Sequence, residues 1–150
     1  MASIDAALIE RFYAAFDARD GEAMASSYGP HARFSDPVFP DLRGEEPGAM
    51  WKMLTQQAKT LHVELLEHDD SSARWRAHYI FSQAGRPVVN DVHATFRFAD
   101  GLIVEHTDEF DFHRWARQAL GTPGLLFGWT PLLRNAVRRK ARASLDRFMA

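Results

Sequence analysis

An aspartate interrupts an apolar stretch at residues 32–41, ARFSDPVFPD, where Asp36 lies directly before Pro37. A carboxylate among phenylalanine and valine side chains has two explanations. It caps a surface turn or pairs with Arg33 or Arg43, or it is an acid buried in a pocket. In a pocket, loss of hydration raises the pKa of the carboxyl group and suits it to proton transfer near neutral pH. The stretch alone leaves both explanations open.

A second group of titratable side chains lies in EHTDEFD, residues 105–111. If these residues form a strand, alternation places His106 and Asp108 on one face and Asp111 on the other. A β-bulge would reverse the position of Asp111. The histidine and a carboxylate either transfer protons or satisfy each other as a structural pair, so both aspartates stay candidates for a catalytic site.

The sequence predicts neither a bound metal nor a cofactor. It contains no cysteine, and its seven histidines lack a ligand spacing such as HExxH. The glycine-containing segment GTPGLLFG lacks the Gly-Lys-Ser/Thr of a phosphate-binding loop.

Length and composition indicate one globular domain. The chain has 150 residues, of which 46% are hydrophobic and 25% charged. Its first residues, MASIDAALIERF, carry charges where a signal peptide has an apolar core, and no apolar run is long enough to span a bilayer. We therefore expect a soluble, cytoplasmic protein.

The charge is unevenly distributed along the chain. Residues 1–112 hold 10 basic and 19 acidic side chains, whereas residues 113–150 hold 8 basic and 1 acidic, giving a net charge of −2. A basic segment can bind nucleic acid or anionic lipid. Because leucine and tryptophan share this segment, helix packing is the simpler interpretation, and we predict no nucleic-acid or membrane partner.

The hydrophobic periodicity changes along the chain from that of helices to that of strands. Residues 3–19, 21–28 and 49–58 have helical patterns, with a short strand at 32–36. Four strand patterns follow at 62–69, 73–83, 86–98 and 102–112, with hairpin turns at Gly85 and at Asp100-Gly101. Residues 113–121 and 132–149 again read as helices, separated by an irregular apolar segment. This order predicts an α+β fold.

The order of elements resembles the SnoaL-like branch of the nuclear transport factor 2-like superfamily, which includes ketosteroid isomerases, limonene epoxide hydrolases and polyketide cyclases. The resemblance covers about residues 4–112 and rests on IERFYAAFDARDGEAMASSYGPHARFSDPV, FSQAGRPVVNDVHATFRFADGLI and EHTDEFD. It implies a cone-shaped α+β barrel over residues 1–112, with helices packed on a strongly curved sheet. Residues 113–150 would form a helical extension packed on the same domain. The resemblance also implies a homodimer formed through the outer face of the sheet.

The resemblance also implies roles for individual residues. The general base of ketosteroid isomerases precedes Pro-Val, and Asp36 matches it. The two oxyanion donors of those enzymes fall at Phe12 and Ala94, which cannot donate, so we exclude the ketosteroid isomerase reaction itself. The acid of SnoaL-like cyclases falls at Asp111.

Limonene epoxide hydrolases need an arginine between two aspartates. Arg74, Arg76 and Arg97 all have the outward parity of their strands, which makes that reaction less favoured.

If Ala94 faces the cavity, alternation and the helical periodicity select the other lining residues. The predicted catalytic residues are Asp36, His106, Asp108 and Asp111. The predicted substrate-binding residues are Phe12, Phe16, Tyr28, Trp51, Trp75, Tyr79, Asn90, Phe96 and Phe110. An apolar pocket with a few polar groups is typical of small-molecule sites, although such aromatic residues also build ordinary cores.

Three functions fit this pattern. The first is a cofactor-free enzyme that isomerises, cyclises, hydrates or dehydrates a small hydrophobic carbonyl-like substrate. The second is a pocket that binds a small hydrophobic molecule without reaction. The third is a dimerisation module whose cavity is filled by its own side chains.

Overall fold

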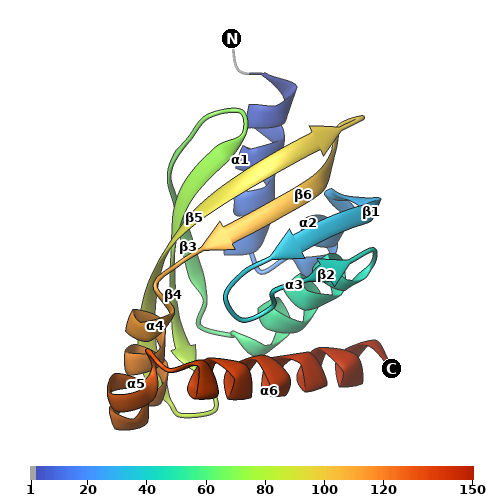
Figure 1. Cartoon of the computed structure of the whole chain (residues 1–150). Helices are drawn as coiled ribbons and strands as arrows, with labels where there is room; N and C mark the ends of the chain where they lie inside the picture. The colour runs from blue at the N-terminus through green and yellow to red at the C-terminus, as the bar shows by residue number, and fades with distance from the viewer. Residues whose placement is uncertain (1–2) are drawn as a thin grey trace.

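The computed structural model describes residues 3–150, which form helices and one mixed sheet (Figure 1). The helices are α1 (Ile4–Asp17), α2 (Gly21–Ser26), α3 (Glu46–Gln57), α4 (Phe112–Leu120), α5 (Thr122–Phe127) and α6 (Pro131–Met149). The strands are β1 (Tyr28–Ser35), β2 (Leu42–Arg43), β3 (His62–His68), β4 (Ser72–Phe81), β5 (Arg86–Ala99) and β6 (Leu102–Glu109). The predicted α+β class is confirmed.

The sheet stays open and does not close into a barrel. Its strand order is β2-β1-β6-β5-β4-β3, and all neighbours are antiparallel except β1 and β6. The expected barrel is therefore wrong in this detail. Closure would require the two edge strands to pair with each other. Because β2 has only two residues and pairs with β1, it gives β3 no edge to join.

Alternation along the long central strands separates core from surface. Trp75 and Ala77 of β4 and Val92 of β5 are buried, whereas Arg74, directly before Trp75, and His93, directly after Val92, are exposed. The β5–β6 hairpin turns through Asp100 and Gly101, whose φ values are +54° and +75°. This pair of left-handed conformations is typical of the tight hairpin that the sequence predicted.

The C-terminal helices cover one end of the sheet. Residues 122–127, predicted to be irregular, form α5, because Pro123 fits the first turn of a helix. Gly121 ends α4 with a φ of +71°. The last helix, α6, runs beneath the sheet and contacts α3 (Figure 1). Its Leu145 is fully buried in the same core as the residues of α1 and β4.

Replacement of Leu145 by alanine tests whether α6 belongs to the main core. We expect Leu145→Ala to lower the free energy of unfolding by about 2–5 kcal/mol, because a buried side chain leaves a cavity. The matched change Leu132→Ala, on the exposed side of the same helix, should cost less than about 0.5 kcal/mol. Urea denaturation measures both, and equal effects would mean that α6 does not depend on its core contacts.

Candidate functional site

A cavity of about 440 Å³ lies between the inner face of the sheet, α3 and α6. Its walls are mostly apolar, and the polar groups on them come from five helices and strands and from two loops. The polar and titratable lining residues are Asp36, Gln57, Tyr79, Ser82, Gln83, Asn90, Asp108, Lys140 and Ser144. A concave apolar space with few polar groups is the usual form of a small-molecule site.

Asp36 reaches this cavity from the loop that follows β1. Its Oδ1 accepts hydrogen bonds from the backbone N–H groups of Val38 at 2.7 Å and Phe39 at 2.6 Å. The backbone N–H of Asp36 donates to the carbonyl of Phe39 at 2.9 Å. Pro37 stands inside this turn, where its fixed φ favours the bend. Both explanations offered by the sequence therefore hold together, because Asp36 caps a turn and also lines the cavity.

The surroundings of Asp36 favour its neutral form. Burial raises the pKa of the carboxyl group to about 7, and the negative charge of Asp108 acts in the same direction. The hydrogen bonds from Phe39 and Val38 and the positive charge of Arg138 oppose the shift without cancelling it. A carboxyl group with this pKa can both accept and donate a proton near neutral pH.

Asp108 lies at the end of a buried chain of hydrogen bonds. The indole N–H of Trp51 donates to the Tyr28 hydroxyl at 2.7 Å, and that hydroxyl lies 2.8 Å from Nδ1 of His106. Nε2 of His106 lies 2.9 Å from Oδ1 of Asp108. The His106 ring is almost completely buried and stacks on Phe96, with ring centroids 4.3 Å apart.

The direction of this chain follows from its two ends. The indole N–H of Trp51 can only donate, and the Asp108 carboxylate can only accept, so Nε2 of His106 donates a hydrogen bond to Asp108. In the neutral imidazole, Nδ1 then accepts the hydrogen bond of the Tyr28 hydroxyl. Four buried polar side chains thus find hydrogen-bond partners in one continuous chain. This chain holds the Asp108 carboxyl group in a fixed orientation.

Tyr79 supplies a hydrogen-bond donor to the same cavity. Its oxygen accepts the indole N–H of Trp115 at 2.8 Å, which leaves the phenolic proton free to donate. Burial raises the pKa of Tyr79 to about 12, the hydrogen bond from Trp115 opposes this, and the charge of Asp36 adds to it. Tyr79 is therefore a neutral donor close to Asp36.

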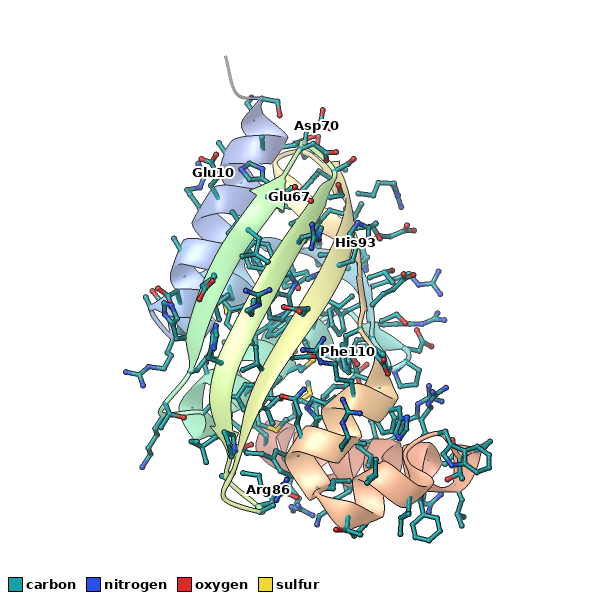
Figure 2. The ribbon with its side chains drawn as sticks, turned by 90° about the vertical axis from the view of Figure 1, so that its left-hand side faces the viewer. Glu10, Glu67, Asp70, Arg86, His93 and Phe110 are labelled. Carbon is teal, nitrogen blue, oxygen red and sulfur yellow. The ribbon has the colours of Figure 1, made fainter. Side chains whose placement is uncertain are left out.

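The structure places most, but not all, of the predicted residues at the cavity. The lining includes Asp36, Phe16, Trp51, Trp75, Tyr79, Asn90, Asp108 and Phe110. Figure 2 shows Phe110 where β6 gives way to α4. Phe12, Tyr28, Phe96 and His106 lie behind the wall in the core, where their rings contact one another.

Asp111 lies outside the cavity. It is exposed and caps α4, where its side chain accepts a hydrogen bond from the backbone N–H of Arg114 at 3.0 Å. No bulge turns it inward, because the β5–β6 register runs regularly from His93–Glu109 to Arg97–Glu105. Of the two alternatives, Asp108 is therefore the residue that shares the cavity with Asp36.

Sequence reasoning missed the contributions of the C-terminal helices. Trp115 orients Tyr79, and Leu133, Val137 and other residues of α6 form one wall. Arg138 of α6 donates to the carbonyl of Pro37 at 2.9 Å, which fastens the Asp36 loop. The helical stripe of α6 signalled an apolar face, but no local pattern showed which surface that face covers.

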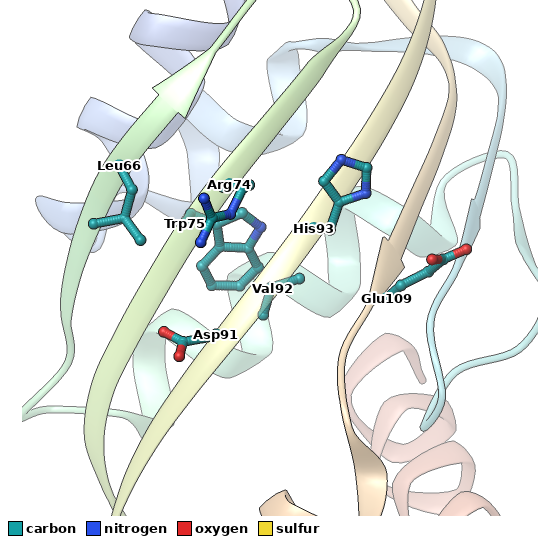
Figure 3. Close-up of a pocket in the computed structure, with 7 residues that line it drawn as sticks. All are labelled: Leu66, Arg74, Trp75, Asp91, Val92, His93 and Glu109. Carbon is teal, nitrogen blue, oxygen red and sulfur yellow. The ribbon is translucent and has the colours of Figure 1, made fainter.

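A second hollow, of about 160 Å³, lies on the outer face of the sheet (Figure 3). The outward side chains that border it are Leu66, Arg74, Asp91, His93 and Glu109. Arg74 and Asp91 already have ion-pair partners in Glu67 and Arg76. The hollow is small, open and lined by solvated charges, so it is a weaker candidate for a ligand site.

No group of three or more potential metal-ligating side chains was found among residues 3–150. In the same residues, no helix is both long and apolar enough to cross a bilayer.

Comparison with known proteins gives the sequence a family and the structure several relatives. Residues 9–106 match the SnoaL-like domain family. Among curated proteins, none matches the chain. A protein assigned as a polyketide cyclase from Xanthomonas campestris pv. campestris is 18% identical, with a TM-score of 0.61 over 77% of this chain and 96% of that one.

Two further structures extend the similarity in fold. An LEH-like epoxide hydrolase from M. tuberculosis is 18% identical, with a TM-score of 0.65 over 83% of this chain and 94% of that one. A protein of ketosteroid isomerase-like fold from Catenulispora acidiphila, in complex with trimethylamine, is 18% identical, with a TM-score of 0.63 over 83% and 97%. At these identities the likeness concerns the fold.

The raised pKa of Asp36 predicts a pH-dependent difference in stability between the wild type and Asp36→Asn. The folded-state pKa, about 7, lies above the unfolded value of about 3.9, so protonation favours the fold. That stabilisation is complete below pH of about 4 and is lost as pH rises to about 7. Asparagine keeps the Oδ1 acceptor for both backbone N–H groups and does not titrate.

The unfolding free energy of Asp36→Asn relative to wild type should therefore increase with pH between about 4 and 7, by at most about 1.4 kcal/mol per pH unit, and then stay constant. Chemical denaturation over this range measures it. A difference that stays constant throughout would mean that Asp36 is solvated.

Proposed function

This chain belongs to the SnoaL-like domain family, and we propose that it is an enzyme that transfers protons on a small hydrophobic carbonyl-like substrate. The observation that carries the proposal is the pair of carboxyl groups, Asp36 and Asp108, on the wall of one apolar cavity. Asp36 has a pKa of about 7, and Asp108 is held by His106. When two carboxyl groups in one site have different environments, one can act as the base and the other as the acid.

In the proposed reaction, Asp36 acts as the general base. Its Oδ1 is occupied by two backbone N–H groups, which leaves Oδ2 for the substrate. The carboxylate removes a proton from the carbon next to the carbonyl, the C–H electron pair moves toward the carbonyl oxygen, and an enolate forms. The proton then returns to the same or another carbon, or to a departing hydroxyl group, which gives isomerisation or dehydration. These steps use only side chains of this chain and no cofactor.

Tyr79 is proposed to stabilise the enolate. A neutral phenol whose oxygen already accepts the Trp115 N–H has its proton available for the developing negative charge. Donors that act on charge appearing in the transition state usually make the largest single contribution to catalysis. Tyr79 on β4 would thus take the part that Phe12 and Ala94 cannot. Asp108 lies opposite Ala94 in the β5–β6 register. It would donate or accept a proton where the reaction needs a second acid–base group besides Asp36.

A non-catalytic pocket is the competing function. The apolar walls, with Trp51, Trp75 and Phe110, are sufficient to bind a small hydrophobic molecule whether or not the carboxyl groups react. The two functions differ in whether a bound compound exchanges protons with water.

The homodimer expected from the sequence stays a proposal. The outer face of the sheet would form its interface, since Ile80 is exposed there beside His78 and the Arg76–Asp91 ion pair. This face mixes apolar and polar groups as non-obligate interfaces do.

Hydrogen exchange in D₂O tests the enzyme proposal without knowledge of the natural substrate. We expect small cyclic ketones and enones to incorporate deuterium next to the carbonyl in the presence of the protein, as followed by proton NMR. Asp36→Asn and Asp108→Asn should each slow this exchange by about 10²–10⁴-fold. The exposed cap variant Asp111→Asn is the matched control and should leave the rate unchanged.

The pH profile of this exchange supplies a second readout. Because the base must be ionised, kcat/KM should rise with pH and level off above about 7. Binding of a ketone without any exchange, or exchange that Asp36→Asn does not alter, would favour the non-catalytic pocket.

A further inference from the structure

The end of the molecule formed by α5 and the start of α6 exposes large apolar side chains. Half or more of the surface of most of them is open to solvent, including 70% for Trp129 and 78% for Leu132. Five such residues fall within eight positions of the chain: Leu125, Leu126, Phe127, Trp129 and Leu132. Soluble proteins rarely expose contiguous apolar patches of this kind unless the patch has a function.

Tight packing of α5 against α4 leaves the large apolar side chains of α5 facing solvent. A Cβ on Gly124 would lie 1.9 Å from the carbonyl oxygen of Ala116, and one on Gly128 would lie 2.8 Å from the His113 ring. Gly124 of α5 and Gly128 directly after it therefore pack against α4, and no room remains there for leucine or phenylalanine side chains. The indole N–H of Trp129 donates to the carbonyl of Leu126 at 3.0 Å, so the indole can enter an apolar phase with its polar group satisfied.

Basic side chains continue the exposed face of α6 beyond Leu132. On α6, Arg139 and Arg147 follow Leu132 at intervals of seven and eight residues and share its exposed face. Within residues 3–150, no ion pair involves Arg139, Lys140 or Arg147. The single acidic residue of α4–α6, Asp146, pairs with Arg142. The exposed face of α6 that continues from Leu132 is therefore basic.

We propose that this α5–α6 surface docks on an anionic lipid bilayer. Leucine, phenylalanine and tryptophan would enter the interface, and the basic side chains would contact the lipid phosphates, as in amphipathic helices that lie on membranes. The patch lies at the end of the molecule opposite the N-terminus, where α6 runs along the base (Figure 1). A second copy of the chain is a poorer occupant, because two such basic surfaces would repel each other.

The position of the cavity suggests why the protein would dock on a bilayer. This part of the inference rests on the proposed function. The opposite side of α6 lines the cavity through Leu133, Val137 and Ala141. A bilayer at the α5–α6 surface would therefore lie next to one cavity wall, where an apolar substrate dissolved in lipid could enter. This proposal departs from the sequence-based expectation, which preferred helix packing to anionic lipid for the basic segment and predicted no membrane partner.

Co-sedimentation of the full chain with vesicles tests the proposal independently of any activity. We expect binding to vesicles of phosphatidylcholine and phosphatidylglycerol in equal parts, much weaker binding to pure phosphatidylcholine, and weakening as salt rises above about 0.15 M. Phe127→Ser/Trp129→Ser should reduce binding by roughly tenfold or more. The matched control Ile4→Ser, at an exposed apolar residue outside the patch, should not.

The charge requirement has its own pair of variants. Arg139→Gln/Arg147→Gln should weaken binding to the anionic vesicles, whereas Arg11→Gln on the distant α1 should leave it unchanged. If the serine variant does not fold, brominated lipids provide a second test, because they should quench wild-type tryptophan fluorescence but not the fluorescence that remains in Trp129→Phe.

Three results would overturn the proposal. The first is no binding to anionic vesicles at low salt. The second is equal binding by the wild type and by folded Phe127→Ser/Trp129→Ser. The third is a change of oligomeric state, seen by sedimentation velocity, when Trp129 is replaced with no change in vesicle binding; this would assign the surface to a second copy of the chain.

Discussion

The partly buried Asp36 carboxyl group is held in place at the cavity wall by two backbone N–H groups. This interaction fixes the turn after β1, from which Asp36 lines the cavity. Burial of a carboxylate is costly unless it is protonated or hydrogen bonded, and Asp36 is partly both. Helix α6 completes the arrangement, because Arg138 fastens the same turn through the carbonyl of Pro37. The C-terminal helices are therefore part of the site.

The second carboxyl group, that of Asp108, is held by hydrogen bonds from the core and not by the backbone of a turn. Asp108 receives a hydrogen bond from a histidine that is itself oriented by a tyrosine and a tryptophan, all inside the aromatic core. Removal of any member would leave a buried polar group without a partner, which typically costs about 1–3 kcal/mol. The core thus stabilises the fold and sets the chemistry of the cavity with the same residues.

Much of this could be predicted from the sequence, because it depends on local patterns. Alternation placed Trp75, Tyr79 and Asp108 on the inner face, and the Asp-Gly pair predicted the β5–β6 hairpin. The family resemblance directed attention to Asp36. Alternation also gave the correct face for Asp111, where the family motif suggested otherwise. Helix capping, which needs a side chain at the first turn of α4, explains why an aspartate stands there.

The remainder depends on contacts between distant segments. Tyr28, Phe96 and His106 have the periodicity of cavity residues, but the depth at which a side chain lies behind the wall is set by packing with α1 and α3. The contacts of Trp115 with Tyr79 and of Arg138 with Pro37 join residues that are far apart in the chain. No short pattern encodes them. The sheet does not close into a barrel because β2 is too short. The sequence around β2, which is rich in glycine and proline, did not predict this strand or its length.

The most direct test of this account is a carbon-13 NMR titration of the Asp36 carboxyl group, assigned with Asp36→Asn. We expect a pKa of about 7, and a lower value in Asp108→Asn, because the neighbouring negative charge would be gone. A pKa near the unperturbed value of about 3.9 would mean that Asp36 is solvated and would contradict the proposed acid–base site.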